Sequence, residues 1–366
     1  MQIKSATSAT TPVRRPLQPR RFSADRLTRP ALQNKDRTGF ERAVACLDHS
    51  PNGSIVYRHT KAIAEGLNIP VKVIHVVQGS DPQSGPSDPI KWQLQCREAR
   101  DHLRQILKEE HDMLSEQDQL LLNGFVGEEL AHWACENSGS LMAVTTRCNR
   151  IGRSVRDFGA ANYIGSTAQK LLESSTASML FIPPDMRDTG VVSYRRVIVP
   201  LDGSCRAESI LPIAMRIARH HGAEVILAHV VPKPEIVEAR ASAEEASLLV
   251  DRMRQFNEQN VREYLDGLKE RLQDESIVIE TMVSADGDPR EQLVDIAKAQ
   301  MADLIVMSAR GNSKVTNISY GNVVRHIATH SSIPLLMIRQ QGPNSRDPGK
   351  LFDGNRGPRM FWEPAH

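Results

Sequence analysis

An internal duplication constrains the fold of this 366-residue chain more than any other feature. An aspartate precedes a histidine by 27 residues at two places, in the pairs Asp48–His75 and Asp202–His229. Both histidines lie in similar apolar runs, VKVIHVV and VILAHVV. Unrelated segments rarely share both a long spacing and a local pattern, so the chain is predicted to fold as two copies of one unit.

A second spacing recurs near the end of each copy. Gly165 and Gly321 each lie 17 residues before the end of an apolar run, and the two runs, ESSTASMLFI and HSSIPLLMI, resemble each other. The loops before these glycines differ in length, because Val144 to Gly165 spans 21 residues and Val306 to Gly321 spans 15. The first copy is therefore expected to carry about six extra residues in this loop.

Both copies alternate short apolar runs with segments of helical period, which predicts an α/β fold. Short connections between such elements favour a parallel sheet, so we expect two tandem doubly wound parallel-sheet domains of Rossmann-like type. The predicted domains are residues 39–184 and 194–340, joined by a linker at 185–193. The tails 1–38 and 341–366 lack periodicity and are rich in Arg, Pro, Ser or Gly, so both are expected to be disordered or mobile.

Two of the expected helices have glycines at their ends. The first copy predicts a helix over Ile55–Glu65 that Gly66 stops, and the second copy predicts one over Ile210–His221 that Gly222 stops. The pair His220-His221 closes the second of these helices, where imidazoles compensate the helix dipole better than they bind metal.

The composition excludes several classes of function. The net charge is +2, but residues 1–38 carry +7 and the remainder is slightly acidic at −5. The aromatic share of 4% argues against a nucleic-acid surface built on base stacking. No apolar run reaches the roughly 20 residues that span a bilayer, and no signal-peptide core follows Met1, so we expect a cytoplasmic protein without a membrane partner. The basic tail is interpreted as a solvated segment, with a basic arm or targeting peptide as the alternative.

The cysteines and histidines indicate no metal site. The five cysteines have no metal-binding spacing, which suits a reducing compartment. Cys205 is interpreted as a small buried hydrophobe rather than a reactive thiol. His75 and His229 are interpreted as core histidines rather than general bases.

The candidate ligand site lies where strands end. In doubly wound sheets, ligands bind outside the carboxyl ends of the strands, where the winding reverses. Asp48 and Asp202 end the first strand of each copy, while Gly311 and Gly321 bracket the loop after the fourth strand of the second copy. A helix begins after Gly321, and its unpaired N–H groups suit an anion. The alternatives are helix caps and Asx turns for the aspartates and an ordinary connecting turn for the glycines.

At these residues the chain resembles a known family. Both copies, over residues 40–184 and 194–340, are similar to universal stress protein domains, and the whole chain resembles a tandem member of that family. The family pattern is an Asp at the first strand end, a His-Val pair on the second strand, and G-2x-G-9x-G-[ST] after the fourth strand. ATP-binding members use the glycine motif for the phosphates and ribose and the strand ends for adenine.

For the second copy, the resemblance implies an adenine-nucleotide site. Its expected contacts are Pro200, Leu201, Asp202, Val230, Met307, Ser308, Gly311, Gly321, Asn322 and Val323. Two positions depart from the family pattern, since Ser308 stands where the first glycine is expected and Asn322 where Ser or Thr is expected. An Asn can still cap a helix and donate to an oxygen, so that change is the milder one.

For the first copy, the resemblance is weaker. The expected contacts are Asp48, Val76, Gly165 and Ser166. The glycine loop does not align, because Thr146 occupies the first glycine position and the inserted residues contain several arginines, namely Arg147, Arg150, Arg153 and Arg156. Guanidinium groups could hold phosphates in place of backbone amides, and the alternative is a solvated basic loop.

Three hypotheses about function remain open. The first is a non-enzymatic stress-response module that binds ATP, with or without Mg²⁺, and whose occupancy alters association with a partner or with itself. The second is a dimerisation scaffold with a vestigial pocket. The third is a slow ATPase, although no base or metal ligand can be named for it, and neither a Walker loop nor the loop of ATP pyrophosphatases is present.

The resemblance also predicts how the two copies associate. Family members pair through the last strand of the sheet, which Met179–Ile182 and Leu335–Ile338 would supply. We therefore expect an internal pseudo-dimer of the two copies, with further self-association into a homo-oligomer as an option.

Overall fold

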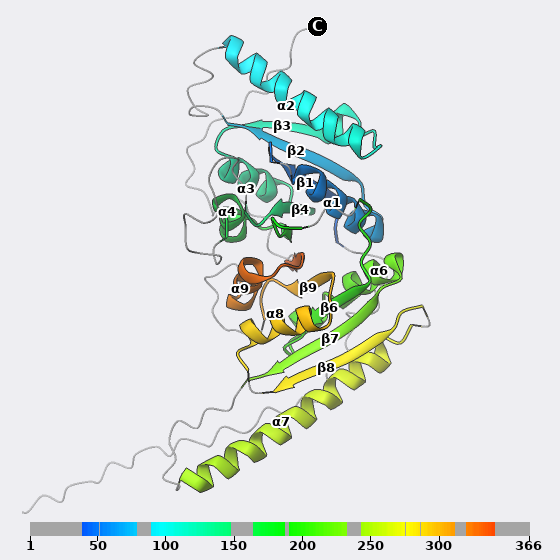
Figure 1. The fold of residues 1–366 in the computed structure, drawn as a ribbon, viewed down its shortest axis with the longest axis vertical. Helices are drawn as coiled ribbons and strands as arrows, with labels where there is room; N and C mark the ends of the chain where they lie inside the picture. The colour runs from blue at the N-terminus through cyan, green and yellow to red at the C-terminus, as the bar shows by residue number, and fades with distance from the viewer. Residues whose placement is uncertain are drawn as a thin grey trace, which may run out of the picture.

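The computed structural model describes residues 39–50, 52–78, 89–147, 164–186, 190–232, 243–274, 276–285, 287–311 and 320–340 (Figure 1). Both predicted tails and most of the arginine-bearing insertion, residues 148–163, lie outside these ranges, as do residues 187–189 of the predicted linker. The described elements alternate between strands and helices, and the predicted α/β class is confirmed.

The first half of the fold contains β1 to β5. Its strands are β1 (Arg42–Leu47), β2 (Val71–Val77), β3 (Gln119–Asn123), β4 (Ser140–Thr145) and β5 (Ser178–Ile182). Its helices are α1 (Gly53–Leu67), α2 (Pro89–Glu109), the short 3-10 helix η3 (Glu116–Asp118), α3 (Val126–Glu136) and α4 (Ser166–Ser174).

The second half repeats this order with β6 to β10. Its strands are β6 (Arg196–Pro200), β7 (Glu224–Val231), β8 (Ile279–Ala285), β9 (Leu304–Ser308) and β10 (Leu335–Ile338). Its helices are α5 (Cys205–Glu208), α6 (Leu211–His221), α7 (Ala243–Arg271), α8 (Pro289–Ala299) and α9 (Asn322–His330). The single-turn helix α5 has no counterpart in the sequence-based expectations.

All ten strands form one sheet, in the order β3-β2-β1-β4-β5-β10-β9-β6-β7-β8. Neighbours within each half are parallel, so the winding reverses between β1 and β4 and again between β6 and β9. The halves meet where β5 and β10 pair antiparallel, with Leu335 opposite Phe181 and Met337 opposite Met179. The two copies therefore share a continuous sheet rather than only a linker.

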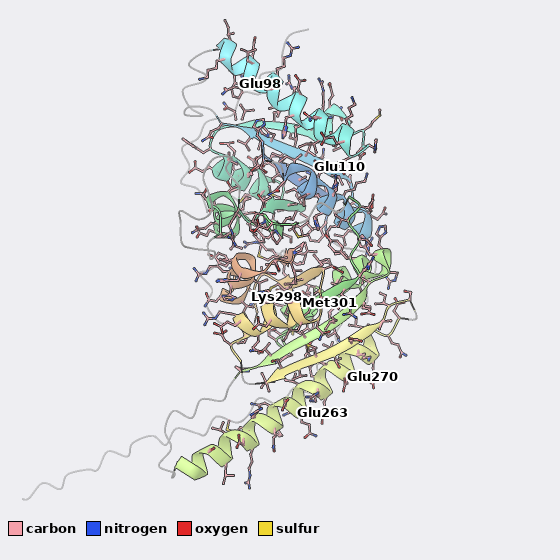
Figure 2. All side chains as sticks on the ribbon, in the orientation of Figure 1. Glu98, Glu110, Glu263, Glu270, Lys298 and Met301 are labelled. Atoms are coloured by element: carbon pink, nitrogen blue, oxygen red, sulfur yellow. The ribbon has the colours of Figure 1, made fainter. Side chains whose placement is uncertain are left out.

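Helices cover both faces of this sheet (Figure 1). Buried side chains from α1, α2, α6 and α7 form a core on one face, and those from α3, α4, α8 and α9 form a core on the other. Successive strand residues alternate between the cores, as Val44 and Ala45 do. Polar side chains such as Glu98 on α2 and Glu263 on α7 lie on the outside (Figure 2). Of the helices in the described ranges, none combines the length and apolar character needed to cross a membrane.

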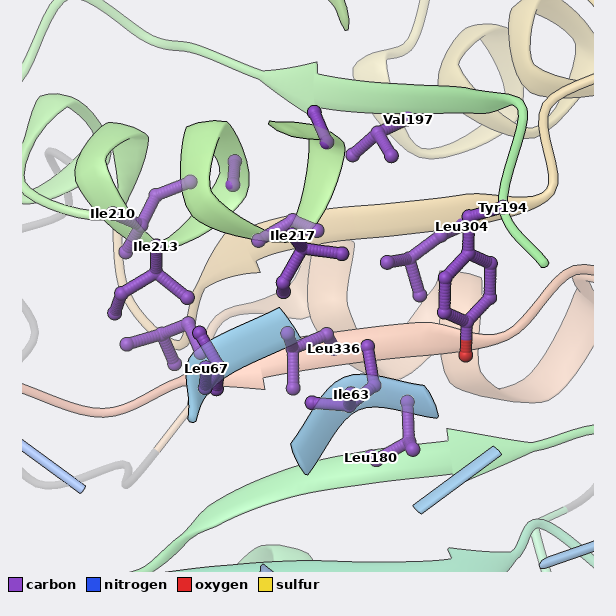
Figure 3. Close-up of a cluster of buried hydrophobic side chains, with 14 of the residues drawn as sticks. Ile63, Leu67, Leu180, Tyr194, Val197, Ile210, Ile213, Ile217, Leu304 and Leu336 are labelled. Atoms are coloured by element: carbon purple, nitrogen blue, oxygen red, sulfur yellow. The ribbon is translucent and has the colours of Figure 1, made fainter. Parts of the chain in front are cut away.

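The cluster of large side chains in Figure 3 contains residues from both halves. Ile63 and Leu67 of α1 lie with Ile213 and Ile217 of α6, and Tyr194 is 1% exposed among them. Hydrogen bonds cross the same junction, from Arg216 to the Leu67 carbonyl at 2.8 Å, for example. Because apolar burial is the main stabilising contribution to folding, this cluster indicates that the two halves stabilise each other.

The expected stop of the first helix at Gly66 is wrong. Helix α1 continues through Gly66 to Leu67 and is capped by Asn68, which adopts the left-handed conformation with φ 54°. A Cβ added at Gly66 would lie 3.3 Å from the Cα of Ile217 on α6. Gly66 therefore permits close packing of α1 on α6 and does not end the helix. The other expected stop is confirmed, since Gly222 caps α6 with φ 64°.

The strand register corrects the length assigned to the inserted loop. Thr145 pairs with Ile182 in the first half, and Ser308 pairs with Ile338 in the second, so Thr145 and Ser308 are equivalent. The alignment of the two copies by sequence had instead made Thr146 equivalent to Ser308. A shift of one residue moves every side chain to the opposite face, so the structural register is the one that preserves both cores. Counted from Thr145 to Gly165 and from Ser308 to Gly321, the loop of the first half is about seven residues longer than that of the second.

Candidate functional site

The candidate site of the second half lies at the carboxyl ends of β6 and β9. These strands are adjacent, with Val197 opposite Leu304, so the residues that follow them meet at one edge of the sheet. A Cβ built on Gly311, after β9, would overlap Oδ2 of Asp202, after β6. The structure therefore brings together the aspartate and the glycine that the sequence had singled out, and only a glycine leaves room for this approach.

A tight turn holds Asp202 at this position. Its Oδ1 accepts a hydrogen bond from the Ser204 amide at 3.0 Å. Gly203 between them has φ 72°, a conformation that glycine adopts at little cost. Ser204 caps the short helix α5 by accepting from the Ala207 amide at 3.1 Å. The Asx turn, one alternative to a ligand role for Asp202, is present. The other alternative, a helix cap, is not, because Ser204 and not Asp202 caps α5. The Oδ2 atom of Asp202 lies against the Gly311 backbone.

The loop after β9 returns to its own strand end. The Gly321 amide donates to the Ala309 carbonyl at 2.8 Å, which seats the start of α9 beside β9. Gly321 itself is the N-cap, and no described side chain caps the helix. Asn322 is the first helical residue and is exposed, so the capping role that an Asn can fill is not used here. An N-terminus without a side-chain cap presents amide groups and a positive dipole end to an incoming anion.

Ser308, which replaces the first family glycine, is committed to its own loop. The residue is 8% exposed, and its hydroxyl donates to the Arg310 carbonyl at 2.8 Å. The side chain therefore folds back along the chain.

The remaining expected contacts of the second half are buried or partly buried. Leu201 donates its amide to Ala228 at 2.8 Å and is buried, as is Pro200. Val230 and Met307 are each 7% exposed in the core beneath α8 and α9. Val323 packs on the same core and is partly buried. Leu201 belongs to the core on the face of α6 and α7, whereas Val230, Met307 and Val323 belong to the core on the face of α8 and α9.

Two further side chains surround Asp202. The carboxylate of Asp202 opposes the lowering of the His229 pKa by burial. It also adds to burial and Glu208 in raising the pKa of Tyr264 on α7. Tyr264 donates to Glu208 Oε1 at 3.1 Å, and Arg271 lies 3.4 Å from the other oxygen of that carboxylate. Tyr264 was missed because the sequence indicated only a mostly helical segment over residues 234–272, with no signal for a single residue.

The first half reproduces part of this geometry. The Ser50 amide donates to Asp48 Oδ1 at 3.0 Å, as in the second half. The Gly165 amide donates to the Thr146 carbonyl at 2.7 Å, and Gly165 caps α4. Ser166 begins that helix and is exposed, and Val76 is 8% exposed in the core. The loop between β4 and Gly165 lies mostly outside the described residues, so no contact of Asp48 with it is established.

Arg147 is directed elsewhere than the phosphate hypothesis required. Its guanidinium donates to the Thr329 carbonyl at 3.1 Å, at the end of α9 in the second half. A cation at a helix C-terminus is favourable, so Arg147 contributes to the junction between the halves. Arg150, Arg153 and Arg156 lie outside the described residues.

Three histidines gather at the first-half site. The ring of His49 lies 4.6 Å from that of His75 and 4.8 Å from that of His102, centroid to centroid. His75 Nδ1 lies 2.9 Å from the Leu47 carbonyl and His102 Nε2 lies 3.1 Å from the Asp48 carbonyl. Burial, with a further contribution from His49, lowers the pKa of His75 to about 4. Sequence reasoning missed this cluster because its members come from three separate elements.

The cysteines and possible metal ligands of the chain were also located. Cys205, expected to be buried, is exposed at the start of α5, because that short helix turns its first residue outward. Burial raises the pKa of Cys46 on β1 well above its usual range. In the described ranges, no group of three or more His, Cys, Asp or Glu side chains is arranged to hold a metal ion.

Comparison with known proteins finds similarity in the second half. Residues 193–339 match the sequence model of the Universal stress protein family. Universal stress protein YxiE of Bacillus subtilis is 24% identical over 148 residues, which are 40% of this chain and 99% of that protein. Universal stress protein Rv2005c of Mycobacterium tuberculosis is 26% identical over 190 residues, which are 52% of this chain and 61% of that protein.

A solved structure resembles more of the chain. A universal stress protein from Archaeoglobus fulgidus aligns with a TM-score of 0.52 and 16% identity, covering 82% of this chain and 96% of that one. At this identity the likeness concerns the fold alone. Its coverage exceeds the length of the matched domain, which indicates a second copy of the same fold in the first half.

Proposed function

We propose that the chain is a tandem universal stress protein whose second half binds an adenine nucleotide. The observation that carries this proposal is the placement of the Asp202 carboxylate against the Gly311 backbone. An aspartate at this position can accept a hydrogen bond from a ribose hydroxyl or an adenine amino group. The loop that starts at Gly311 leads to the N-terminus of α9 at Gly321, which suits a phosphate.

Charge and hydrogen bonding agree with a ligand that is anionic at one end and polar at the other. The amides at the start of α9 attract phosphate oxygens through the dipole of that helix. Asp202 repels phosphates and therefore orients a bound nucleotide with its sugar or base toward β6. Any Mg²⁺ would arrive on the phosphates, since the described residues offer no cluster of metal ligands.

The proposed output is association rather than catalysis. The halves share a sheet through β5 and β10, and this pairing supports the internal pseudo-dimer expected of a tandem member. Nucleotide held by Asp202, Gly311 and the start of α9 would lie at the end of β9, the strand next to β10 at this junction. A change in that surface is the proposed signal to a protein partner or to a second copy of the chain.

One observation favours a second candidate, a scaffold without a ligand. A continuous ten-stranded sheet and a core built from both halves join the two copies, which suits a scaffold. Ser308 in place of a motif glycine also fits a site that has lost its ligand.

Mass spectrometry of gently purified protein separates the two functions. Adenine nucleotide released on denaturation, or retained after incubation with ATP and Mg²⁺ and rapid desalting, supports the nucleotide-binding module. The Asp202→Ala variant serves as the paired sample and is expected to release less. No nucleotide from the wild type under either condition contradicts the proposal and leaves the scaffold.

A further inference from the structure

The strand register and the turns make the two candidate sites comparable residue by residue. His49 and Gly203 are equivalent, because each follows the site aspartate and precedes a serine whose amide bonds that aspartate. His75 and His229 are equivalent, since His75 pairs with Leu47 and the Leu201 amide bonds the residue before His229. One half therefore has an imidazole where the other has no side chain.

The long helices contribute a second equivalent pair. Val73 pairs with Gln119 in the first half and Leu227 pairs with Thr281 in the second, which aligns β3 with β8. His102 and Tyr264 each lie 17 residues before these aligned positions. The residues that follow them, Leu103 and Leu265, are both fully buried against the sheet. His102 and Tyr264 thus occupy the same place on α2 and α7.

In the second half, the equivalent positions carry two rings and no third. Asp202 opposes the lowering of the His229 pKa by burial and adds to burial and Glu208 in raising the pKa of Tyr264, so its carboxylate acts on both side chains. Gly203, the residue after Asp202, adds no side chain beside them. A planar aromatic base would make favourable ring contacts with such side chains.

In the first half, three imidazoles stand at the corresponding positions, and that of His49 is exposed. The rings of His75 and His102 are 6.5 Å apart, and the ring of His49 lies 4.6 Å from one and 4.8 Å from the other. His102 is fixed by its bond to the Asp48 carbonyl, and His75 by its bond to the Leu47 carbonyl. The imidazole of His49 therefore rests against two positioned rings at the site where a base would lie.

We infer that His49 is a built-in occupant of the first-half site, so that only the second half accepts the base of an adenine nucleotide. An imidazole is itself a flat nitrogen heterocycle, and it makes contacts with the rings of His75 and His102 like those that a base would make. This inference rests on the proposed function and decides the number of ligands that one chain binds. A single position, His49 in the first copy and Gly203 in the second, decides which half binds the base.

Photolabelling with an azidoadenosine tests the inference without involving phosphates or the divergent loop. The protein is irradiated with 2-azidoadenosine, digested, and the modified peptides are mapped by mass spectrometry. Wild-type protein is expected to label within residues 194–340 only. His49→Ala is expected to label the first half as well, at a level comparable with that of the second half.

Two control variants show whether bulk at position 49 is the cause. His49→Leu refills the space and is expected to leave the first half unlabelled. His132→Ala removes an imidazole of α3 that pairs with Glu136 at 3.2 Å, away from the cluster, and is expected to behave as wild type. Labelling of the second half in the same sample verifies that each variant is folded.

The outcomes separate the inference from the proposed function. Labelling of both halves in wild type, or of the second half alone in His49→Ala, overturns the inference while nucleotide binding stands. Equal labelling of the first half in His49→Leu and His49→Ala also overturns it. Absence of label from both halves of every protein contradicts the proposed function, and the inference falls with it.

Discussion

The carboxylate of Asp202 lies so close to the Gly311 backbone that a Cβ at position 311 would overlap its Oδ2. The two residues are far apart in sequence and meet because β6 and β9 are neighbours in the sheet. The obstructing atom is the end of a side chain, so a larger residue at 311 would displace the carboxylate rather than unfold the protein. The relationship can therefore be broken without loss of the fold.

Close packing of α1 on α6 depends on Gly66. Gly66→Val is expected to lower the free energy of unfolding by roughly 1–3 kcal/mol beyond any change in helix propensity, because the added atoms meet the Ile217 backbone. Gly267→Val in α7 is the matched control, since a Cβ there has no atom within 4 Å. The two variants are compared by urea denaturation. Equal destabilisation by both would show that the α1–α6 contact contributes nothing.

Stability is expected to fall as the pH decreases from about 6.5 to about 4, partly through His59. This residue is 4% exposed, lies 2.9 Å from the Tyr194 hydroxyl, and has its pKa lowered by burial to about 4. An unfolded histidine has a pKa of about 6.5, so between these values the unfolded chain binds more protons and is favoured. Above about pH 6.5 the folded state loses nothing from this residue.

The His59→Gln variant isolates this contribution. Its unfolding free energy is expected to vary less between pH 7.5 and 4.5, by up to about 3 kcal/mol, because the titrating group is gone. His75 also has its pKa lowered to about 4 and provides a pH dependence that remains in the variant. Urea midpoints measured across this range provide the test. Identical pH profiles for variant and wild type would contradict the role of His59.

Cys205 is expected to react with iodoacetamide faster than Cys46, and nucleotide is expected to slow it. Cys205 is exposed beside the turn that holds Asp202, whereas burial raises the pKa of Cys46 and keeps it a thiol. Rates are measured for each cysteine by digestion and mass spectrometry, with and without ATP. Unchanged Cys205 modification at saturating ATP would place the nucleotide away from β6.

Much of the fold follows from the sequence because its signals are local. The first strand ends just before Asp48 and Gly222 caps α6, as expected, because an apolar run and a left-handed cap are signals carried by consecutive residues. Gly66 carries the same local signal as Gly222 but a different role. Its role depends on Ile217 in the other half, which no local pattern reveals.

The site could be predicted in outline for the same reason. Asp202 and Gly311 were placed at strand ends by pattern, and parallel topology then brings them together. His49, His102 and Tyr264 could not be placed in this way, since one lies in a loop and two on long helices that approach the site only after packing. The strand register could not be predicted from the sequence either. The sequence made Thr146 the equivalent of Ser308, whereas the structure makes it Thr145.

Isothermal titration of ATP into wild type, Gly311→Val and Gly267→Val tests the central claim most directly. Wild type and Gly267→Val are expected to bind with the same affinity. Gly311→Val is expected to bind ATP at least about tenfold more weakly, a loss of at least ~1.4 kcal/mol of binding free energy. Its thermal unfolding midpoint is expected to be no lower than that of Gly267→Val. Binding by Gly311→Val at the wild-type affinity, or no binding by the wild type, would contradict the account.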